Sequence, residues 1–120
     1  MGIVETSSRP TALERGLLED LCASGALTTE QVHRLRFPGT GTSNCRLRLM
    51  DLRRRGLVMR LECCSGEDRA VWWAVTAAGA AQVGRRPRGA WSPARLERRL
   101  AAGDRYVEET LARRVRMLGD

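Results

Sequence analysis

The sequence of 120 residues contains no lysine, so arginine supplies all 21 of its basic residues. Aromatic residues are scarce at 4%, and there is a single histidine, His33. One histidine excludes most histidine-based catalytic triads and histidine-rich metal sites. The chain also lacks a phosphate-binding glycine loop and a paired-carboxylate motif. We therefore expect a protein that is not an enzyme and that uses no cofactor.

Long apolar runs are also missing. The sequence has no run of about 18 apolar residues, which a membrane-spanning helix requires. Residues 1–5 lack the basic start and the apolar stretch of a signal peptide. These two absences predict a cytoplasmic protein with no membrane partner.

The cysteines do not show the paired spacing of zinc ligands, so we predict no metal site. Cys22 and Cys45 fall on apolar helical faces, where cysteine acts as a small buried hydrophobic residue. A redox or metal sensor at Cys63 and Cys64 is the alternative. It is disfavoured because neighbouring residues of a strand point to opposite faces and cannot easily bridge.

Arginine is the residue that the sequence has in excess. Against 14 acidic residues, the 21 arginines leave a net charge of +7 and an isoelectric point near 10.8. This excess favours a polyanionic partner, with nucleic acid as the first candidate. The guanidinium group suits bidentate contact with phosphates and guanine edges. A GC-rich coding bias would give the same arginines without selection for binding.

Two capping boxes predict where the first two helices begin. Thr11 can accept a backbone N–H while the side chain of Glu14 reaches back to the backbone of Thr11. Thr28 and Gln31 repeat this arrangement at the start of a short second helix. Leucines at helical spacing follow Thr11, and Gly25 ends the first helix.

A third helix is predicted to run to about Arg55. Thr42 or Ser43 is expected to cap it, and Gly56 to end it in a left-handed conformation. At about 100° per residue, one side of this helix forms an apolar stripe that faces the core, consisting of Cys45, Leu49 and Leu52. The opposite side and its flanks carry Ser43, Arg46, Leu47, Arg48, Met50, Arg53 and Arg54.

Residues 57–75 predict a β-hairpin. Alternation over residues 57–64 is typical of a half-buried strand, and the residues expected to face inward are Leu57, Met59, Leu61 and Cys63. Residues 65–69 predict the turn and residues 70–75 the returning strand. Trp73 is expected in the core, whereas Trp72 either packs under the C-terminal helices or is exposed as a partner contact.

The C-terminal region combines a basic linker with helices. One helix is predicted from Pro93 to about residue 102, and Gly103 separates it from a last helix that reaches toward Leu118. The last helix carries an apolar stripe that includes Tyr106, Leu111, Val115 and Leu118. We favour packing of this stripe on a second copy, as a homodimer. The alternative is that the stripe folds back on the first helix of the same chain.

The order helix, short helix, loop, helix and hairpin within about 75 residues is the winged helix-turn-helix arrangement. We therefore predict an α+β fold, mostly α, with three helices, a β-hairpin wing and C-terminal helices. Residues 1–10 would be a flexible lead-in, residues 11–84 the winged helix-turn-helix domain, and residues 85–120 the linker and dimerisation element. The third helix of such a domain enters the major groove of DNA.

Two segments resemble known winged-helix regulators. Residues 46–58, which end in Gly-Leu-Val, resemble the recognition-helix end of MarR-like and PadR-like regulators, and residues 72–79 resemble their strand-to-helix corner. With residues 27–32 and 36–38, the chain is more similar still to the replication-relaxation family of actinobacterial plasmids and mobile elements. The resemblance covers about residues 11–84 and implies DNA binding.

Positive charge is concentrated on the third helix and the strand after it, where residues 43–60 hold six arginines and one acid. Near the start of a recognition helix, arginine can pair with guanine, asparagine with adenine, and apolar residues with the thymine methyl. The predicted base contacts are therefore Ser43, Asn44, Arg46, Leu47 and Met50. Arginines farther along the helix, on its flanks and at the wing bind phosphates, and the predicted contacts are Arg48, Arg53, Arg54 and Arg69.

The leading hypothesis is a sequence-selective binder of double-stranded DNA that acts as a transcriptional or plasmid-replication regulator. A bacterial, nucleoid-associated homodimer would fit this role, and a small-molecule effector is left open. The alternative is a protein-interaction adaptor that uses the winged-helix fold, with Trp72 and the C-terminal helices as its contact surface.

Overall fold

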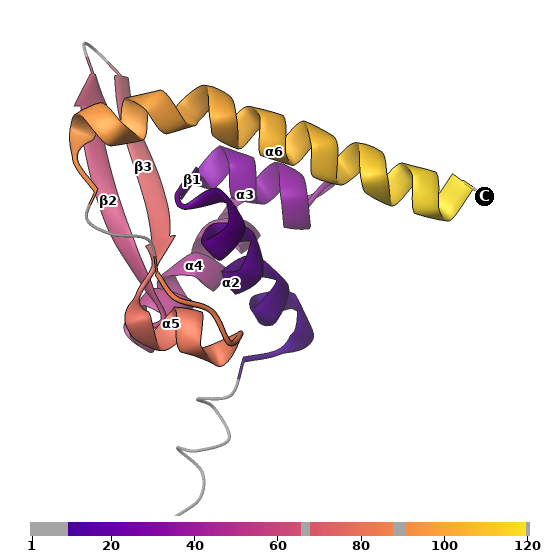
Figure 1. Ribbon diagram of the computed structural model, residues 1–120, viewed down its shortest axis with the longest axis horizontal. Helices are drawn as coiled ribbons and strands as arrows, with labels where there is room; N and C mark the ends of the chain where they lie inside the picture. The colour runs from indigo at the N-terminus through magenta and orange to yellow at the C-terminus, as the bar shows by residue number, and fades with distance from the viewer. Residues whose placement is uncertain (1–9, 66–67, 88–90, 120) are drawn as a thin grey trace, which may run out of the picture.

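The computed structural model describes residues 10–65, 68–87 and 91–119. It is an α+β protein, mostly helical, with a small three-stranded antiparallel sheet (Figure 1). The flexible lead-in predicted for residues 1–10 lies outside the described residues apart from Pro10. In chain order the elements are α2 (Ala12–Ser24), β1 (Leu27–Thr28), α3 (Thr29–Arg36), α4 (Thr42–Arg54), β2 (Val58–Ser65), β3 (Asp68–Val75), α5 (Ala77–Gln82) and α6 (Pro93–Gly119).

The starts of α2 and α3 follow from their capping boxes. The hydroxyl of Thr11 accepts the N–H of Glu14, and the Glu14 carboxylate accepts the N–H of Thr11 at 2.9 Å. Thr28 and Gln31 make the same reciprocal pair at the start of α3. Both predictions are confirmed, and each box satisfies two backbone donors that a helix N-terminus leaves without partners.

The N-terminus of α4 differs from the prediction. Gly41 is the capping residue, with extended backbone angles, and no side chain caps the helix. The predicted cap at Thr42 or Ser43 is wrong because the chain becomes helical one residue earlier, which places both hydroxyls inside the first turn. The end of α4 is as predicted, since Gly56 follows it with φ of 76°.

The sheet has the order β1-β3-β2, so the predicted hairpin is confirmed and gains a third strand. The two residues of β1 are too few to show an alternating pattern in the sequence. In the β2–β3 register Val58 lies opposite Val75, and both are buried. The inward direction predicted for Met59 is wrong, because this register turns Val58 to the main core and leaves Met59 38% exposed.

The strands continue farther toward the hairpin turn than predicted. Ser65 pairs with Asp68, and Arg69 pairs with Cys64 inside β3. The placement of Arg69 in the turn is therefore wrong, because ladder pairing continues through its position. Residues 66–67 lie outside the described part of the chain, as does the side chain of Arg69.

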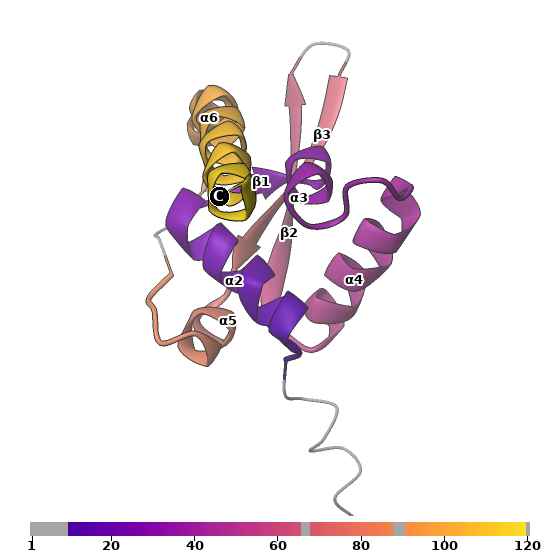
Figure 2. The ribbon, with the colours of Figure 1, turned by 90° about the vertical axis from the view of Figure 1, so that its right-hand side faces the viewer.

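Two apolar clusters pack against opposite faces of the sheet. The larger cluster contains Trp73, Val75 and the buried leucines of α2, α3 and α4. The smaller one places Trp72 against Leu96 of α6, with Ala26 and Ala74 beside them. Figure 2 shows α6 and α4 on opposite sides of the strands. Each tryptophan of the pair therefore belongs to a different cluster.

The C-terminal helix α6 is continuous over 27 residues, so the predicted break at Gly103 is wrong. Gly103 is instead a point of close approach, where a Cβ atom would lie 2.7 Å from the side-chain amide of Gln31. That amide donates to the carbonyl of Leu100 and to the carboxylate of Asp104, at 3.1 Å and 3.0 Å. Contact with α3 therefore requires a glycine inside the helix.

Candidate nucleic-acid interface

Helix α4 has one fully buried and one exposed face. Cys45, Leu49 and Leu52 are 0% exposed, as their apolar stripe predicts. On the other face Leu47 is 69% exposed and Met50 39% exposed. The remaining predicted contact residues on this helix are exposed too, namely Ser43, Asn44, Arg46, Arg48, Arg53 and Arg54. The structure thus brings these predicted DNA contacts together on one surface, here called the α4 face.

The arginines of the α4 face differ in how far acidic side chains engage them. Arg48 lies 3.6 Å from a carboxylate oxygen of Glu14, and Arg54 lies 3.9 Å from one of Asp51. Within the described residues, no ion pair involves Arg46 or Arg53. These two guanidinium groups are therefore the ones most available to an external anion.

Arg55, just past the end of α4, has a structural role that the sequence did not indicate. Its guanidinium donates to Glu14 at 3.0 Å and to Asp51 at 2.8 Å. Glu14 is 2% exposed, so its charge depends on this partner for neutralisation. The carboxylate that closes the capping box of α2 also fixes the C-terminal end of α4, and with it the orientation of the α4 face.

The pKa of Glu14 reflects these contacts. Burial by itself would raise it, but the hydrogen bonds from Arg55 and the Thr11 backbone, with the charges of Arg55 and Arg48, hold it below its ordinary value. A carboxyl whose pKa is lowered by folding stabilises the protein fully above its unfolded pKa, near 4.5. That stabilisation is lost as the pH falls through the lower folded value.

Acidification should therefore cost more stability in the natural protein than in a Glu14→Gln variant. Glutamine can still close the capping box but does not titrate. Urea unfolding from pH 6 to pH 3 measures the difference, and we expect the two stability profiles to converge as Glu14 becomes protonated. Parallel profiles over this range would show that Glu14 is not a source of acid sensitivity.

Trp72 and much of the C-terminal stripe pack inside the chain, which for Trp72 is one of the two alternatives left open and for the stripe differs from the favoured prediction. Trp72 is only 2% exposed, under α6, so its assignment as a partner contact is wrong. The hydroxyl of Tyr106 donates to Asp20 of α2 at 2.8 Å, and Leu111 packs against the main core. These residues fold back on the same chain because α2 offers a buried carboxylate and an apolar surface. Val115 is 68% exposed, and the side chain of Leu118 lies outside the described residues.

The contact between Tyr106 and Asp20 is part of a buried polar link between three helices. Arg36 of α3 donates to the same carboxylate at 2.7 Å, and Asp20 is 4% exposed. Burial, followed by the hydrogen bond and charge of Asp20, raises the pKa of Tyr106 to about 12. The phenol therefore remains a neutral donor, and α6 is held to α2 and α3.

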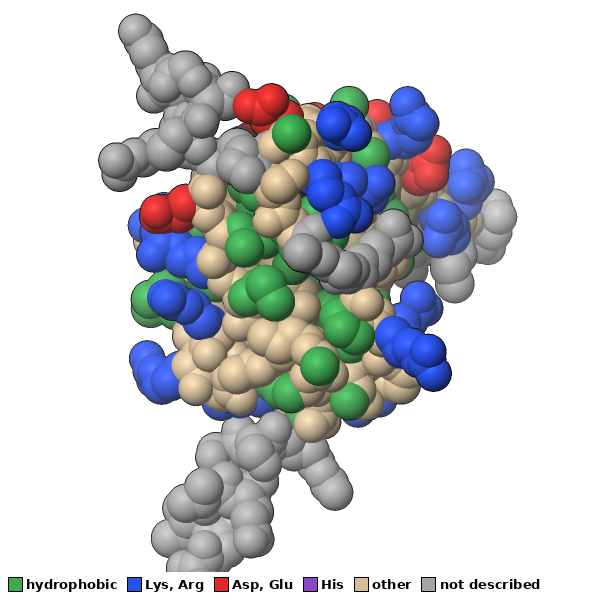
Figure 3. All heavy atoms as spheres, turned by 60° about the vertical axis from the view of Figure 1, so that its left-hand side comes forward, with side chains coloured by type: hydrophobic (Ala, Val, Ile, Leu, Met, Phe, Trp, Pro, Cys, Tyr) green, Lys and Arg blue, Asp and Glu red, His purple; other side chains and the backbone are tan. Residues whose placement is uncertain are grey.

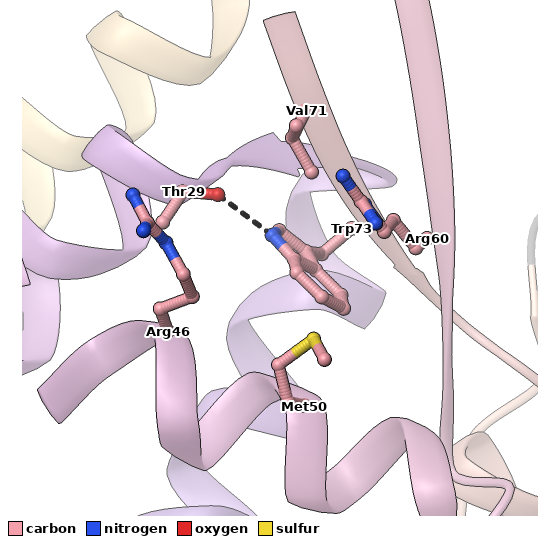
Figure 4. Close-up of a pocket in the computed structure, with 6 residues that line it drawn as sticks. All are labelled: Thr29, Arg46, Met50, Arg60, Val71 and Trp73. Carbon is pink, nitrogen blue, oxygen red and sulfur yellow. Dashed lines mark hydrogen bonds between the residues drawn. The ribbon is translucent and has the colours of Figure 1, made fainter. Parts of the chain in front are cut away.

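A hollow of about 390 Å³ lies between the α4 face and the sheet. Figure 4 shows the side chains that line it: Thr29, Arg46, Met50, Arg60, Val71 and Trp73. The indole N–H of Trp73 donates to the hydroxyl of Thr29 at 2.8 Å. Arg60 was not predicted as a site residue, because only the pairing of β2 with β3 shows that it lies opposite Trp73.

Arginine side chains are not confined to α4. In Figure 3 they stand at several places around the face shown, with hydrophobic side chains between them. Five exposed arginines lie on α6, at positions 95, 98, 105, 113 and 116. Experiments on the α4 face therefore need a matched control for the general effect of positive charge.

The described residues contain no cluster of three or more histidine, cysteine or acidic side chains that could hold a metal ion. Cys22 and Cys45 are buried, as predicted. Burial raises the pKa of Cys45 to about 11 against the opposing charge of Arg46, which keeps it a thiol. The side chains of Cys63 and Cys64 lie outside the described residues. No described helix has the length and apolar character needed to cross a membrane.

The fold and site together define a small, mostly helical α+β protein with an exposed, arginine-bearing helix beside an antiparallel hairpin. A family model described as replication-relaxation matches residues 18–117, and the chain belongs to that family. Comparisons with curated proteins and with solved structures gave no match. The predicted resemblance to this family is confirmed, and membership points to a role in replication.

Proposed function

We propose that this protein binds double-stranded DNA sequence-selectively and acts as a transcriptional or plasmid-replication regulator. The exposed α4 face, backed by a fully buried apolar stripe, carries the proposal. Helix α4 has 13 residues, enough to lie in a major groove with its first turns against base edges. In this role Asn44 and Arg46 read bases, whereas Arg53 and Arg54 hold phosphates.

The β2–β3 hairpin supports a winged-helix interpretation of the same surface. It extends past α3 and α4 at one end of the molecule (Figure 2). When a recognition helix occupies the major groove, such a hairpin can reach the neighbouring backbone. The exposed guanidinium of Arg60 gives β2 a charge for that contact, and its ion pair with Glu62 is solvent-exposed and therefore weak.

Selection of bound fragments from random duplex DNA tests the proposal. We expect one enriched motif, with a palindromic form if two copies bind together. Binding without enrichment would contradict sequence selectivity, and absence of binding would contradict the whole proposal. In the last case, retention of a protein partner would favour the adaptor function.

Affinity for duplex DNA should fall steeply with salt. Each phosphate neutralised releases condensed counterions and contributes about −0.9 to the slope of log K against log salt, so about four contacts give a slope near −3.6 per protomer. The four arginines expected to act in this way are Arg48, Arg53, Arg54 and Arg60. Titrations of a labelled duplex at several salt concentrations measure the slope, and a value near zero would exclude an electrostatic interface.

We further propose that the distal end of α6 forms a homodimer contact. Past α3, this end of the helix projects from the body of the molecule (Figure 1). Val115 is 68% exposed there, and Glu108 and Glu109 precede the arginines at 113, 114 and 116. Antiparallel pairing of two copies would bury Val115 and place acidic residues near arginines, as two-fold symmetry allows.

Val115→Glu should convert a dimer to a monomer, because it places a charge in the contact. Sedimentation equilibrium measures the change. Leu100→Glu is the matched control, since Leu100 is also exposed on α6, at 48%, but lies near its proximal end. A natural protein that remains monomeric at tens of micromolar, or equal effects of both substitutions, would contradict the proposed contact.

A further inference from the structure

The hollow beside the α4 face has the size and lining of a small-molecule site. Its volume of about 390 Å³ falls within the range of about 300–1,000 Å³ that is usual for ligand pockets. Met50, Val71 and Trp73 provide an apolar wall, and the indole N–H of Trp73 is already engaged by Thr29. The wall therefore suits the apolar body of a ligand better than it suits an isolated phosphate.

Two guanidinium groups give the hollow its charge. Arg46 comes from α4 and Arg60 from β2, and Figure 4 shows them on different sides of the Trp73 indole. None of the described residues that line the hollow is acidic. The carboxylate of Glu62 engages Arg60 from outside at 3.0 Å, and Glu62 is 59% exposed. An exposed pair of this kind is worth about 0–1 kcal/mol, so an incoming anion can displace it at little cost.

We propose that this hollow binds a small organic anion, namely a carboxylate attached to a flat apolar body. The carboxylate pairs with Arg60 and Arg46, and the flat body lies against Met50 and Val71 over the edge of Trp73. The polar groups fix the orientation of the ligand, and the apolar contact supplies affinity.

Occupancy of the hollow would regulate DNA binding through Arg46, a consequence that rests on the proposed function. Arg46 belongs both to the hollow and to the α4 face, and it cannot pair with a ligand carboxylate and a DNA base at once. Ligand and DNA therefore compete, and each lowers the affinity of the protein for the other by the same factor.

Calorimetric titration with naphthoate, and with the neutral isostere naphthamide, tests the site without DNA. We expect naphthoate to bind and naphthamide to bind at least about tenfold more weakly, since charge-assisted hydrogen bonds are lost. Arg60→Gln should weaken naphthoate binding about tenfold, and Glu62→Gln should strengthen it by about twofold to fivefold. Arg53→Gln is the matched control and should leave the affinity unchanged.

No binding of naphthoate at millimolar concentration would overturn the proposal. Equal binding of naphthamide would show an apolar slot without anion recognition, and equal losses in Arg60→Gln and Arg53→Gln would show diffuse attraction; either result overturns it as well. The test of naphthoate binding does not depend on whether the protein binds DNA. If the protein fails to bind DNA, the naphthoate titrations still decide whether the hollow is an anion site.

Discussion

Replacing Arg46 and Arg53 together by alanine should weaken binding to duplex DNA by roughly 100-fold. A contact from arginine to a guanine edge is worth about 1–3 kcal/mol, and loss of a phosphate contact adds to it. Fluorescence anisotropy with a labelled duplex at fixed salt measures the change. Thermal stability should stay nearly constant, because both side chains are exposed and neither forms an ion pair in the described residues.

The matched control for this double variant is Arg98→Ala with Arg105→Ala. It removes the same charge from exposed positions on α6, away from the α4 face. We expect it to lose only the small affinity that follows from a lower net charge. Equal losses of DNA affinity in both double variants would mean that binding depends on the net charge of the protein and not on the α4 face. Unchanged affinity in the Arg46/Arg53 variant would mean that α4 is not the contact helix.

Replacing Arg55 by alanine should destabilise the protein by about 3–5 kcal/mol, since removing one partner of a buried pair leaves the other charge with only the weak compensation of the exposed Arg48 at 3.6 Å. Glu14 is the charge left behind, 2% exposed and hydrogen-bonded to Arg55 at 3.0 Å and 3.2 Å. Small domains have about 5–15 kcal/mol of stability in total, so the loss would reach a large part of it. Urea unfolding followed by circular dichroism measures it.

A double variant, Glu14→Gln with Arg55→Met, distinguishes the cost of an uncompensated charge on Glu14 from the cost of losing the packing contacts of Arg55. Glutamine retains the capping box, and methionine fills much of the space of the arginine stem. Much of the stability lost in Arg55→Ala should return in this variant. A loss below about 1 kcal/mol in Arg55→Ala would show that water compensates Glu14 and that the pair does not anchor α4.

The elements that the sequence predicted correctly are those whose signals are local. Thr11 with Glu14, and Thr28 with Gln31, define helix starts within four residues of chain. The stripe of α4 is equally local, because a fixed rotation per residue decides which side carries Leu49 and which carries Arg46. The exposed face of the candidate site could therefore be derived before any tertiary contact was known.

The elements that differed depend on contacts between distant segments. Gly103 looks like a helix break until α3 is placed against it, and Tyr106 looks like a dimer contact until Asp20 of α2 accepts its hydrogen bond. The alternation in β2 predicted Met59 as an inward residue and missed Val58, since both faces of the sheet are covered and only the register with β3 separates them.

The residues of the candidate site also divide into those with a local sequence signal and those whose role depends on distant contacts. Arg46 could be assigned from its helix position alone, whereas Arg60 and Arg55 looked like further members of an arginine-rich segment. Their surroundings set them apart: Arg60 lines a hollow with Trp73, and Arg55 neutralises Glu14. Charge counting along the chain cannot distinguish an arginine that binds a partner from one that holds two helices together.

The proposed function depends on the binding of duplex DNA to the exposed side of α4. Amide signals of the isotope-labelled protein, followed by NMR while a short mixed-sequence duplex is added, test it most directly. We expect the largest shifts within Thr42–Arg54, with the signals of the middle of α6 nearly unmoved. Shifts confined to α6, with α4 unchanged at saturating DNA, would contradict the claim.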